Sequence, residues 1–214
     1  MPLNGKLLVA LPKGRLYEPA RALLARAGLP LAPDAEGSRR LITTDESGRC
    51  DVVSLKPSDI PVYVESGAID AGIAGSDVLR EFEPDVYEPV DLRMGLCRLV
   101  LAAPEGREFR AGVTIRVATK YPRTAEKYFR ARKMHAHIVR LDGSVEIAPL
   151  LNLADGIVDL VETGRTLREN GLRVIDEIAQ VSAKLIVNRT AMKMKSEAVQ
   201  SLIATLDAVV YENP

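Results

Sequence analysis

The sequence predicts an α/β fold with largely parallel strands, and an internal echo raises the question of two lobes of similar build. Short β-branched and leucine-rich runs alternate with amphipathic stretches, which is typical of such folds. The 214 residues, 47% hydrophobic and 27% charged, suffice for one large domain or two small lobes. Residues 70–78 and 159–167 also echo each other: an acid, a five-residue step to glycine, a helix-capping side chain and an apolar restart. Matches this short also arise by chance, so the echo alone leaves the two lobes open.

Three strand–helix pairs follow one another along the chain, and the second helix has the clearest ends. Asp59 can cap its N-terminus, Pro61 lies in the first turn, where no intrahelical N–H is needed, and Gly67 can close it in the left-handed conformation. The pairs are Leu7–Ala10 with Tyr17–Ala27, Asp51–Leu55 with Asp59–Ser66, and Ile115–Ala118 with Thr124–Lys133.

The chain is expected to leave the first lobe and then return to it. A natural boundary lies near Asp91–Gly95, a return crossing lies near Val181–Val187, and an amphipathic helix from Met192 to Val210 closes the chain. The first lobe is then built from both ends of the chain. We expect lobe I to comprise residues 1–93 and 186–214, and lobe II to comprise residues 94–185.

Composition argues against several classes of function. The 29 basic and 29 acidic side chains cancel and only 4% of residues are aromatic, so no nucleic-acid groove is indicated. Cys50 and Cys97 are too few for a disulfide framework and are expected to be buried free thiols. The apolar run before Pro12 is too short for a signal peptide or a membrane span, so we expect a cytoplasmic protein without a membrane partner.

The stretch DGIVDLVETGRTLRENGL, residues 155–172, contains a candidate anion site. A strand is predicted to end at Val161, and a short helix to run from about Thr166 to Asn170. Between them Gly164 lets the backbone turn, while the hydroxyls of Thr163 and Thr166, exposed N–H groups and the positive helix end favour a phosphate. Neither GxxxxGK[ST] nor GxGxxG is present, so no P-loop or nicotinamide site is implied. The alternative is that Thr166 only caps a helix and Gly164 only turns the chain.

Two acids before this loop favour a sugar phosphate over free phosphate. The carboxylates of Asp155 and Asp159 can accept hydrogen bonds from sugar hydroxyls, which suggests a phosphorylated ribose. The alternative is that both acids are solvated at the surface, or that Asp159 caps a neighbouring loop.

The same stretch resembles the phosphoribosyl-diphosphate (PRPP) binding segment of the ATP phosphoribosyltransferase family, which opens histidine biosynthesis. Further blocks resemble that family in the family's order, so the resemblance covers nearly the whole chain. The blocks are LPKGRL at 11–16, SRRLI at 38–42, KPSDIPVYVESGAIDAGIAGSDVL at 56–79, DLRMGLCRLVLA at 91–102, RVATKYPRTAEKYF at 116–129 and LDGSVEIAPL at 141–150.

The resemblance implies a two-lobed periplasmic-binding-protein-like fold of type II, with a mixed, mostly parallel sheet flanked by helices in each lobe and the active site in the interlobe cleft. It also implies a glycosyl transfer that joins N1 of ATP to C1 of PRPP and releases diphosphate. Because charge develops on the sugar and on the leaving diphosphate, positioning and electrostatics can supply catalysis without a nucleophilic side chain. Magnesium is expected to be carried mainly by the substrate diphosphate. His135 and His137 lack further ligands, so no protein metal site is expected.

The family resemblance assigns roles to individual residues of this chain. Lys56 stands where the family often has arginine, which loses bidentate geometry. Arg39 and Arg40 are adjacent, so only one of them can point inward from a strand. For each cation, a solvated surface position remains the alternative. The resemblance assigns PRPP binding to Asp155, Asp159, Glu162, Thr163, Gly164, Arg165 and Thr166, ATP binding to Leu11, Lys13, Gly14, Arg15, Gly75 and Asp77, catalytic charge to Lys13, Arg15, Arg39, Arg40 and Lys56, and a position facing the cleft to Glu146.

The length of the chain bears on its partners. Only about forty residues follow Leu172, which a strand and a helix use up, so no C-terminal regulatory domain is expected. The family's short form works with a regulatory subunit related to histidyl-tRNA synthetase, and the resemblance implies a hetero-octamer of four catalytic and four regulatory subunits built on catalytic homodimers. Two alternatives stay open: a solute-binding module for an anionic ligand, and a phosphoribosyltransferase for another base.

Overall fold

The chain folds into two compact units in the computed structural model. One unit comprises Met1–Gly95 with Ser182–Pro214, and the other comprises Leu96–Val181. The chain returns to the first unit before Ala183, earlier than the expected residue 186. The reason is that the whole strand Ala183–Val187 pairs within the first unit's sheet. The structure describes residues 6–31, 41–107, 109 and 112–211.

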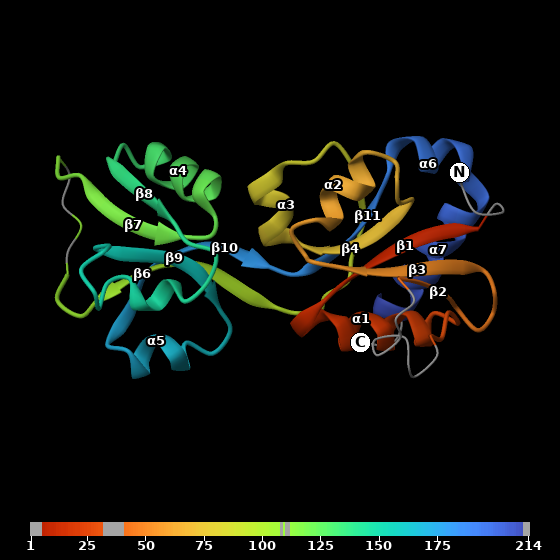
Figure 1. Ribbon diagram of the computed structural model, residues 1–214, viewed down its shortest axis with the longest axis horizontal. Helices are drawn as coiled ribbons and strands as arrows, with labels where there is room; N and C mark the ends of the chain where they lie inside the picture. The colour runs from red at the N-terminus through yellow and green to blue at the C-terminus, as the bar shows by residue number, and fades with distance from the viewer. Residues whose placement is uncertain (1–5, 32–40, 108, 110–111, 212–214) are drawn as a thin grey trace. The chain divides into compact units, whose positions relative to one another are not determined.

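The first unit contains a six-stranded sheet in the order β2-β3-β1-β4-β11-β5 (Figure 1). Strands β3, β1 and β4 are parallel, while β2 pairs antiparallel with β3, and β11 pairs antiparallel with both β4 and β5. The strands are β1 (Leu7–Pro12), β2 (Ile42–Thr44), β3 (Cys50–Leu55), β4 (Ala71–Gly75), β5 (Tyr87–Asp91) and β11 (Ala183–Val187), and the helices are η1 (Gly14–Leu16), α1 (Tyr17–Arg26), α2 (Ile60–Glu65), α3 (Ser76–Phe82), α6 (Arg189–Met194) and α7 (Ser196–Tyr211).

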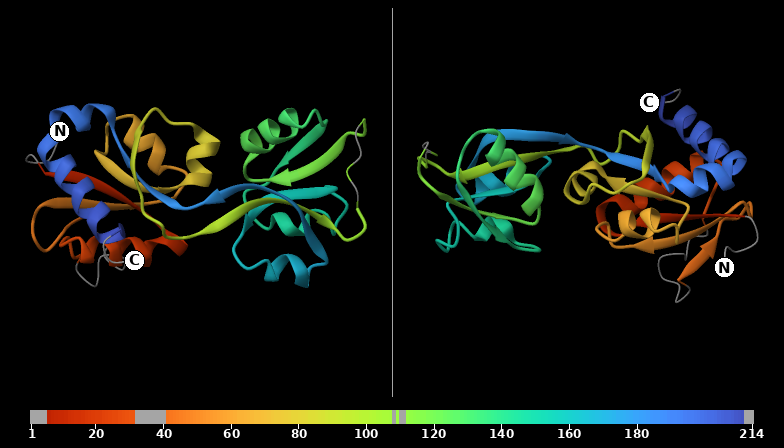
Figure 2. Two further views of the ribbon diagram at one scale, coloured as in Figure 1. Left: turned by 180° about the vertical axis from the view of Figure 1, so that it is seen from behind. Right: turned by 90° about the horizontal axis from the view of Figure 1, so that it is seen from above.

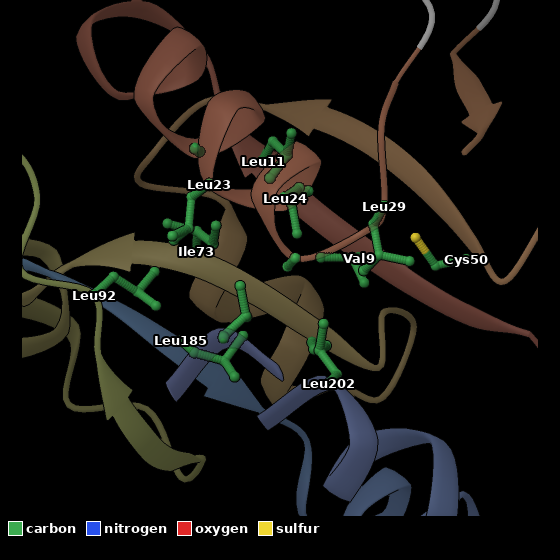
Figure 3. Close-up of a cluster of buried hydrophobic side chains, with 14 of the residues drawn as sticks. Val9, Leu11, Leu23, Leu24, Leu29, Cys50, Ile73, Leu92, Leu185 and Leu202 are labelled. Carbon is green, nitrogen blue, oxygen red and sulfur yellow. The ribbon is translucent and has the colours of Figure 1, made fainter. Parts of the chain in front are cut away.

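Helices cover both faces of this sheet because its central strands are apolar on both sides. Alternation along β1 sends Leu7, Val9 and Leu11 toward α1 and α7, which lie next to each other across one face (Figure 2), and sends Ala10 toward α2 and α3 on the other. Figure 3 shows the larger core of the α1 and α7 face, with Val9, Leu11, Leu23, Leu24, Leu29, Cys50, Ile73, Leu92, Leu185 and Leu202 labelled.

The second unit contains a five-stranded sheet in the order β10-β6-β9-β7-β8. Strands β9, β7 and β8 are parallel, and β6 pairs antiparallel with both β9 and β10. Phe129 and Tyr128 of α4 pack on one face, while Leu167 of α5 and Val145 of η3 pack on the other. Helices α4 and α5 accordingly lie on opposite sides of this sheet (Figure 1). The elements are β6 (Cys97–Pro104), β7 (Ile115–Thr119), α4 (Pro122–Ala131), β8 (Ala136–Arg140), η3 (Val145–Ile147), β9 (Gly156–Val161), α5 (Arg165–Glu169) and β10 (Leu172–Val181).

The internal echo falls on strands that hold equivalent positions in the two sheets. β4 is the third of the parallel strands β3-β1-β4 and is followed by antiparallel β11, just as β9 is the third of β8-β7-β9 and is followed by antiparallel β6. Gly75 and Gly164 are then the N-caps of α3 and α5. Their backbones differ, since φ is −69° at Gly75 but 72° at Gly164. The two units therefore share a sheet plan but not the conformation of these glycines.

Several predicted helix details need correction. Asp59 lies at the N-cap of α2, but its side chain makes no capping hydrogen bond, whereas Gly67 has the expected positive φ of 76°. The predicted closing helix is two helices separated at Lys195, and the first begins earlier because the Asn188 side chain accepts hydrogen bonds from two N–H groups of its first turn. Within the described part of the chain, no helix is long and apolar enough to cross a membrane.

The prediction of buried free thiols is confirmed for Cys50 and Cys97. Burial, together with the nearby Asp45 carboxylate, raises the pKa of the Cys50 thiol to about 12. A thiol that stays protonated at neutral pH is a poor nucleophile, so Cys50 is a packing residue.

Candidate functional site

A sharp turn joins β9 to α5 and forms what we call the 162–166 loop. Strand β9 ends at Val161, and the chain turns at Gly164, whose φ of 72° is strained for any other residue. Helix α5 follows at once and is only five residues long. Its buried residue Leu167 packs with Val161 against the sheet, which fixes the loop at the carboxyl end of β9.

The 162–166 loop forms one wall of a pocket of about 310 Å³ that lies within the second unit. Thr163, Arg165 and Thr166 are exposed, so their side chains are available to a ligand. Every residue predicted to bind PRPP is part of this pocket except Asp155. The lining residues are Glu146, Asp159, Leu160, Val161, Glu162, Thr163, Gly164, Arg165, Thr166 and Leu167.

Hydrogen-bond donors at this loop suit an anion, while the carboxylates of Glu146, Asp159 and Glu162 also line the pocket. The Arg165 guanidinium lies 2.7 Å from the Glu169 carboxylate, and the backbone N–H of Arg165 donates to the Thr163 hydroxyl at 3.4 Å. A helix of five residues has a weak dipole, so the attraction depends mainly on loop N–H groups, hydroxyls and the arginine. Gly164, not Thr166, is the N-cap of α5, so the alternative that Thr166 serves only as a helix cap is wrong.

Two side chains extend the pocket beyond the loop. Glu146 reaches it from η3, and the half-buried Asp159 reaches it from β9. Because Thr119, the last residue of β7, pairs in parallel with Val158, the residue after the strand, Lys120, follows toward Asp159. Lys120 is exposed and was not among the predicted site residues, although the pattern of a cation directly after a predicted strand could have indicated it.

Asp155 requires a correction, because it lies at the opposite end of β9 from the loop. Its carboxylate accepts hydrogen bonds from the side chain of Arg107 at 2.6 Å and from the backbone N–H of Arg116 at 2.8 Å, and it forms an ion pair with Arg116 at 3.2 Å. At ~3.3 Å per strand residue, the six residues of β9 separate it from the loop by about 20 Å. Asp155 therefore links Arg107 and Arg116 within the second unit and does not share a ligand with the 162–166 loop.

The ion pairs of Asp155 predict an acid-sensitive contribution to stability. Burial raises its pKa, but hydrogen bonds from Arg116 and the charges of Arg107 and Arg116 outweigh this, so the pKa is lower than its ordinary value. A carboxyl with a lowered folded-state pKa stabilises the protein above its unfolded value and loses that contribution as pH falls through the folded value. We expect Asp155→Asn to cost about 1.5 kcal/mol at pH 7 and progressively less below about pH 4. Urea unfolding followed by circular dichroism at each pH measures the free energy of unfolding of both proteins. A difference between them that stays the same at every pH would contradict the prediction.

In the first unit, predicted cations meet at the carboxyl ends of neighbouring parallel strands. Pro12 of β1 pairs with Leu55 of β3, and the Lys13 N–H donates to the Leu55 carbonyl at 2.8 Å. Lys13 and Lys56 therefore follow adjacent strands, and both are exposed, as is Arg15. Two ammonium groups on strands ~5 Å apart repel each other unless an anion lies near them. This edge is where open α/β sheets place ligands.

The next strand along this edge brings further predicted residues. β4 ends at Gly75, on the other side of β1 from β3, and Asp77 follows in the first turn of α3. A side chain at Gly75 would collide with the carboxylate of Asp77, a residue that is only 8% exposed. Gly14 adds a flexible backbone with a φ of 79°.

Leu11 is the exception among the residues assigned to ATP. Its side chain is fully buried in the core between the sheet and α1. Alternation on β1 turns it into the protein, so Leu11 supports the strand end and offers a ligand only its backbone.

The remaining predictions concern charge and metal ligands. Arg39 and Arg40 lie outside the described residues. Among the residues that the structure describes, no three His, Cys, Asp or Glu side chains are grouped so that they could hold a metal ion. Each unit thus carries its own part of the predicted site: an anion pocket in the second unit and a cationic strand edge in the first.

Comparison with known proteins places these features in a family. Residues 56–208 match the HisG family, described as ATP phosphoribosyltransferase. A protein of Caldanaerobacter subterraneus subsp. tengcongensis named ATP phosphoribosyltransferase is 46% identical over 202 residues, which cover 94% of this chain and 96% of that protein.

Two solved structures show how widely the fold is shared. The ATP phosphoribosyl transferase (HisG:HisZ) complex from Thermotoga maritima contains a chain that is 34% identical, with a TM-score of 0.85 over 97% of this chain and 100% of that one. The periplasmic aliphatic sulphonate binding protein SsuA from Escherichia coli has a TM-score of 0.60 over 97% of this chain and 74% of its own, at 13% identity. This second likeness concerns the fold alone.

Proposed function

The chain belongs to the ATP phosphoribosyltransferase family, and from that membership we infer that it joins N1 of ATP to C1 of PRPP. The products are 1-(5-phosphoribosyl)-ATP and diphosphate, and the reaction is the first step of L-histidine biosynthesis. The observation that supports this assignment at particular residues is the pocket at the 162–166 loop, which is lined by threonine hydroxyls, one arginine and three carboxylates.

We propose that the ribose 5-phosphate of PRPP binds to the 162–166 loop. Thr163, Thr166 and Arg165 would donate to phosphate oxygens, while Gly164 allows the backbone to approach closely. Asp159 would accept hydrogen bonds from ribose hydroxyls, because its position between the loop and β7 suits a group attached to the phosphate.

ATP and the departing diphosphate are proposed to use the cationic edge of the first unit. Lys13, Arg15 and Lys56 would stabilise negative charge as the bond to diphosphate breaks, which is where electrostatic catalysis has its largest effect. The buried Asp77 and Gly75 shape the floor of this edge. Adenine N1 has its own lone pair, so no protein group needs to remove a proton from it.

Magnesium is proposed to enter with the diphosphate of PRPP, where it neutralises the leaving group. Phosphate oxygens and water are its usual ligands, and among the described residues no three His, Cys, Asp or Glu side chains are grouped so that they could hold the ion themselves. PRPP binding measured by calorimetry should weaken when magnesium is withheld, whereas the ligand-free protein should show no tight magnesium binding of its own.

The activity itself is tested by incubating the protein with ATP, PRPP and magnesium. We expect the adduct to be detected by mass spectrometry, with diphosphate released in equal amount. Formation of a ribosylated product from another base but not from ATP would contradict the assignment.

The 162–166 loop is tested by Thr166→Ala. Because the Thr166 hydroxyl is exposed in the pocket and caps nothing, its loss should weaken PRPP binding about tenfold and leave ATP binding within twofold. Calorimetric titration of each substrate measures both. An equal loss for both substrates would mean that Thr166 only stabilises α5.

A regulatory partner is also proposed. The Thermotoga maritima neighbour was solved as a HisG:HisZ complex, which supports a HisZ-type subunit for this chain. We propose a hetero-octamer of four catalytic and four regulatory chains built on catalytic homodimers. Histidine should then inhibit the mixture but not the purified chain, and full inhibition of the purified chain would contradict the proposal.

A further inference from the structure

We propose that Arg168 is a positioning residue for the 162–166 loop: its guanidinium holds a loop carbonyl and so turns the loop's N–H groups toward the pocket. This rests on the proposed function of that loop as the phosphate site of PRPP. Arg168 lies on α5 and is exposed, and it is not among the residues that line the pocket.

Two hydrogen bonds tie Arg168 to the loop. Its Nη1 donates to the carbonyl of Thr163 at 3.1 Å, and its backbone N–H donates to the carbonyl of Gly164 at 3.1 Å. Both carbonyls that flank the Gly164 Cα therefore accept from residue 168: that of Thr163 from the arginine side chain, and that of Gly164 from the backbone N–H in the ordinary first hydrogen bond of α5, which any residue here would make.

The geometry of the peptide bond determines which backbone groups face away from Arg168. In a trans peptide the C=O and the N–H point in opposite directions, and no cis peptide occurs among the described residues. Fixing the Thr163 and Gly164 carbonyls therefore directs the N–H groups of Gly164 and Arg165 away from Arg168. The Thr163 hydroxyl lies on that second side, since it accepts from the Arg165 N–H at 3.4 Å. The donors thus gather where Thr163 to Thr166 line the pocket.

Gly164 leaves the room that this arrangement requires. A Cβ at residue 164 would lie 3.1 Å from Nη1 of Arg168, tighter than ordinary van der Waals contact. The guanidinium thus packs directly against the turn. Without it, the Thr163 peptide can rotate and aim its carbonyl oxygen, a negative dipole end, at the phosphate.

The test compares Arg168→Ala and Arg168→Lys with wild type in steady-state assays of the adduct. Arg168→Ala should raise KM for PRPP about tenfold while kcat and KM for ATP stay within twofold, because ground-state and transition-state binding of the phosphate weaken together. Arg168→Lys keeps a donor of similar reach and should recover most of the loss. The control is Asn170→Ala, which removes a side-chain hydrogen bond to a helix carbonyl, that of Thr166, and should leave KM for PRPP within twofold.

Ionic strength separates positioning from simple charge attraction. If Arg168 orients the loop, the KM ratio of Arg168→Ala to wild type stays constant between about 0.05 and 0.5 M salt, whereas a ratio that falls to one at high salt overturns the proposal. An equal effect of Asn170→Ala also overturns it. The Thr166→Ala variant tests the phosphate site itself. If KM for PRPP is raised in Thr166→Ala but normal in Arg168→Ala, only the positioning role is refuted. If KM for PRPP is normal in both variants, the phosphate site is refuted as well.

Discussion

Replacing Lys56 with alanine is expected to lower kcat by about 100-fold, because removal of a single charge-stabilising donor from a transition state typically costs this much. Lys56 is exposed at the carboxyl end of β3, next to Lys13 at the end of β1. Its ammonium group has no role in the core, so the fold should be unaffected. Diphosphate release followed continuously with saturating ATP and PRPP measures kcat.

Two further variants show whether this loss is catalytic. Lys56→Arg should retain at least a tenth of wild-type kcat, since it keeps the positive charge and adds bidentate geometry. Lys193 is exposed on α6, which follows the end of β11 and so lies at the opposite end of the sheet. Lys193→Ala should leave kcat unchanged. Equal activity of Lys56→Ala and Lys193→Ala would remove Lys56 from the mechanism.

The fold could be predicted from the sequence largely because each unit follows local rules. Runs such as Leu7–Ala10 and Ile115–Ala118 are short, apolar and bounded by polar or turn-forming residues, and the structure has strands there. The break at Lys195 could not be predicted, because an amphipathic pattern continues across it. There the Lys195 ammonium instead contacts Asp70 at 2.7 Å and the Lys6 carbonyl at 2.9 Å, which are distant in sequence.

The candidate site could be predicted only in part, because sequence patterns show which residues are neighbours in the chain but not which distant residues the fold brings together. Residues adjacent to Gly164 line one pocket because they are neighbours in the chain. Asp155 looked equivalent to Asp159 in sequence, yet a strand carries the two carboxylates to different ends of a sheet, where Asp155 meets Arg107 and Arg116. Conversely, the role inferred for Arg168 depends on a bend that returns its side chain to Thr163, which spacing alone does not show.

The largest loss of substrate binding is expected for Gly164→Val, with PRPP affinity reduced by about 100-fold or more. A β-branched residue at a φ of 72° costs ~1–3 kcal/mol of backbone strain, and its Cβ would lie 3.1 Å from Nη1 of Arg168 and 3.6 Å from Val161. The turn must then open, so the loop N–H groups no longer converge on the phosphate. Calorimetric titration with PRPP measures the loss, and ATP affinity should stay within twofold.

Gly171 provides the matched control for this substitution. It has a similar φ of 66° in the same unit, but a Cβ there meets no atom within 4 Å, and the residue does not line the pocket. Gly171→Val should therefore carry comparable backbone strain and lower the unfolding midpoint to a similar extent, while PRPP affinity remains within about threefold of wild type. If both valine variants lose PRPP binding equally, the effect of Gly164→Val comes from lower stability of the second unit. If only Gly164→Val loses it, the left-handed turn itself shapes the phosphate site.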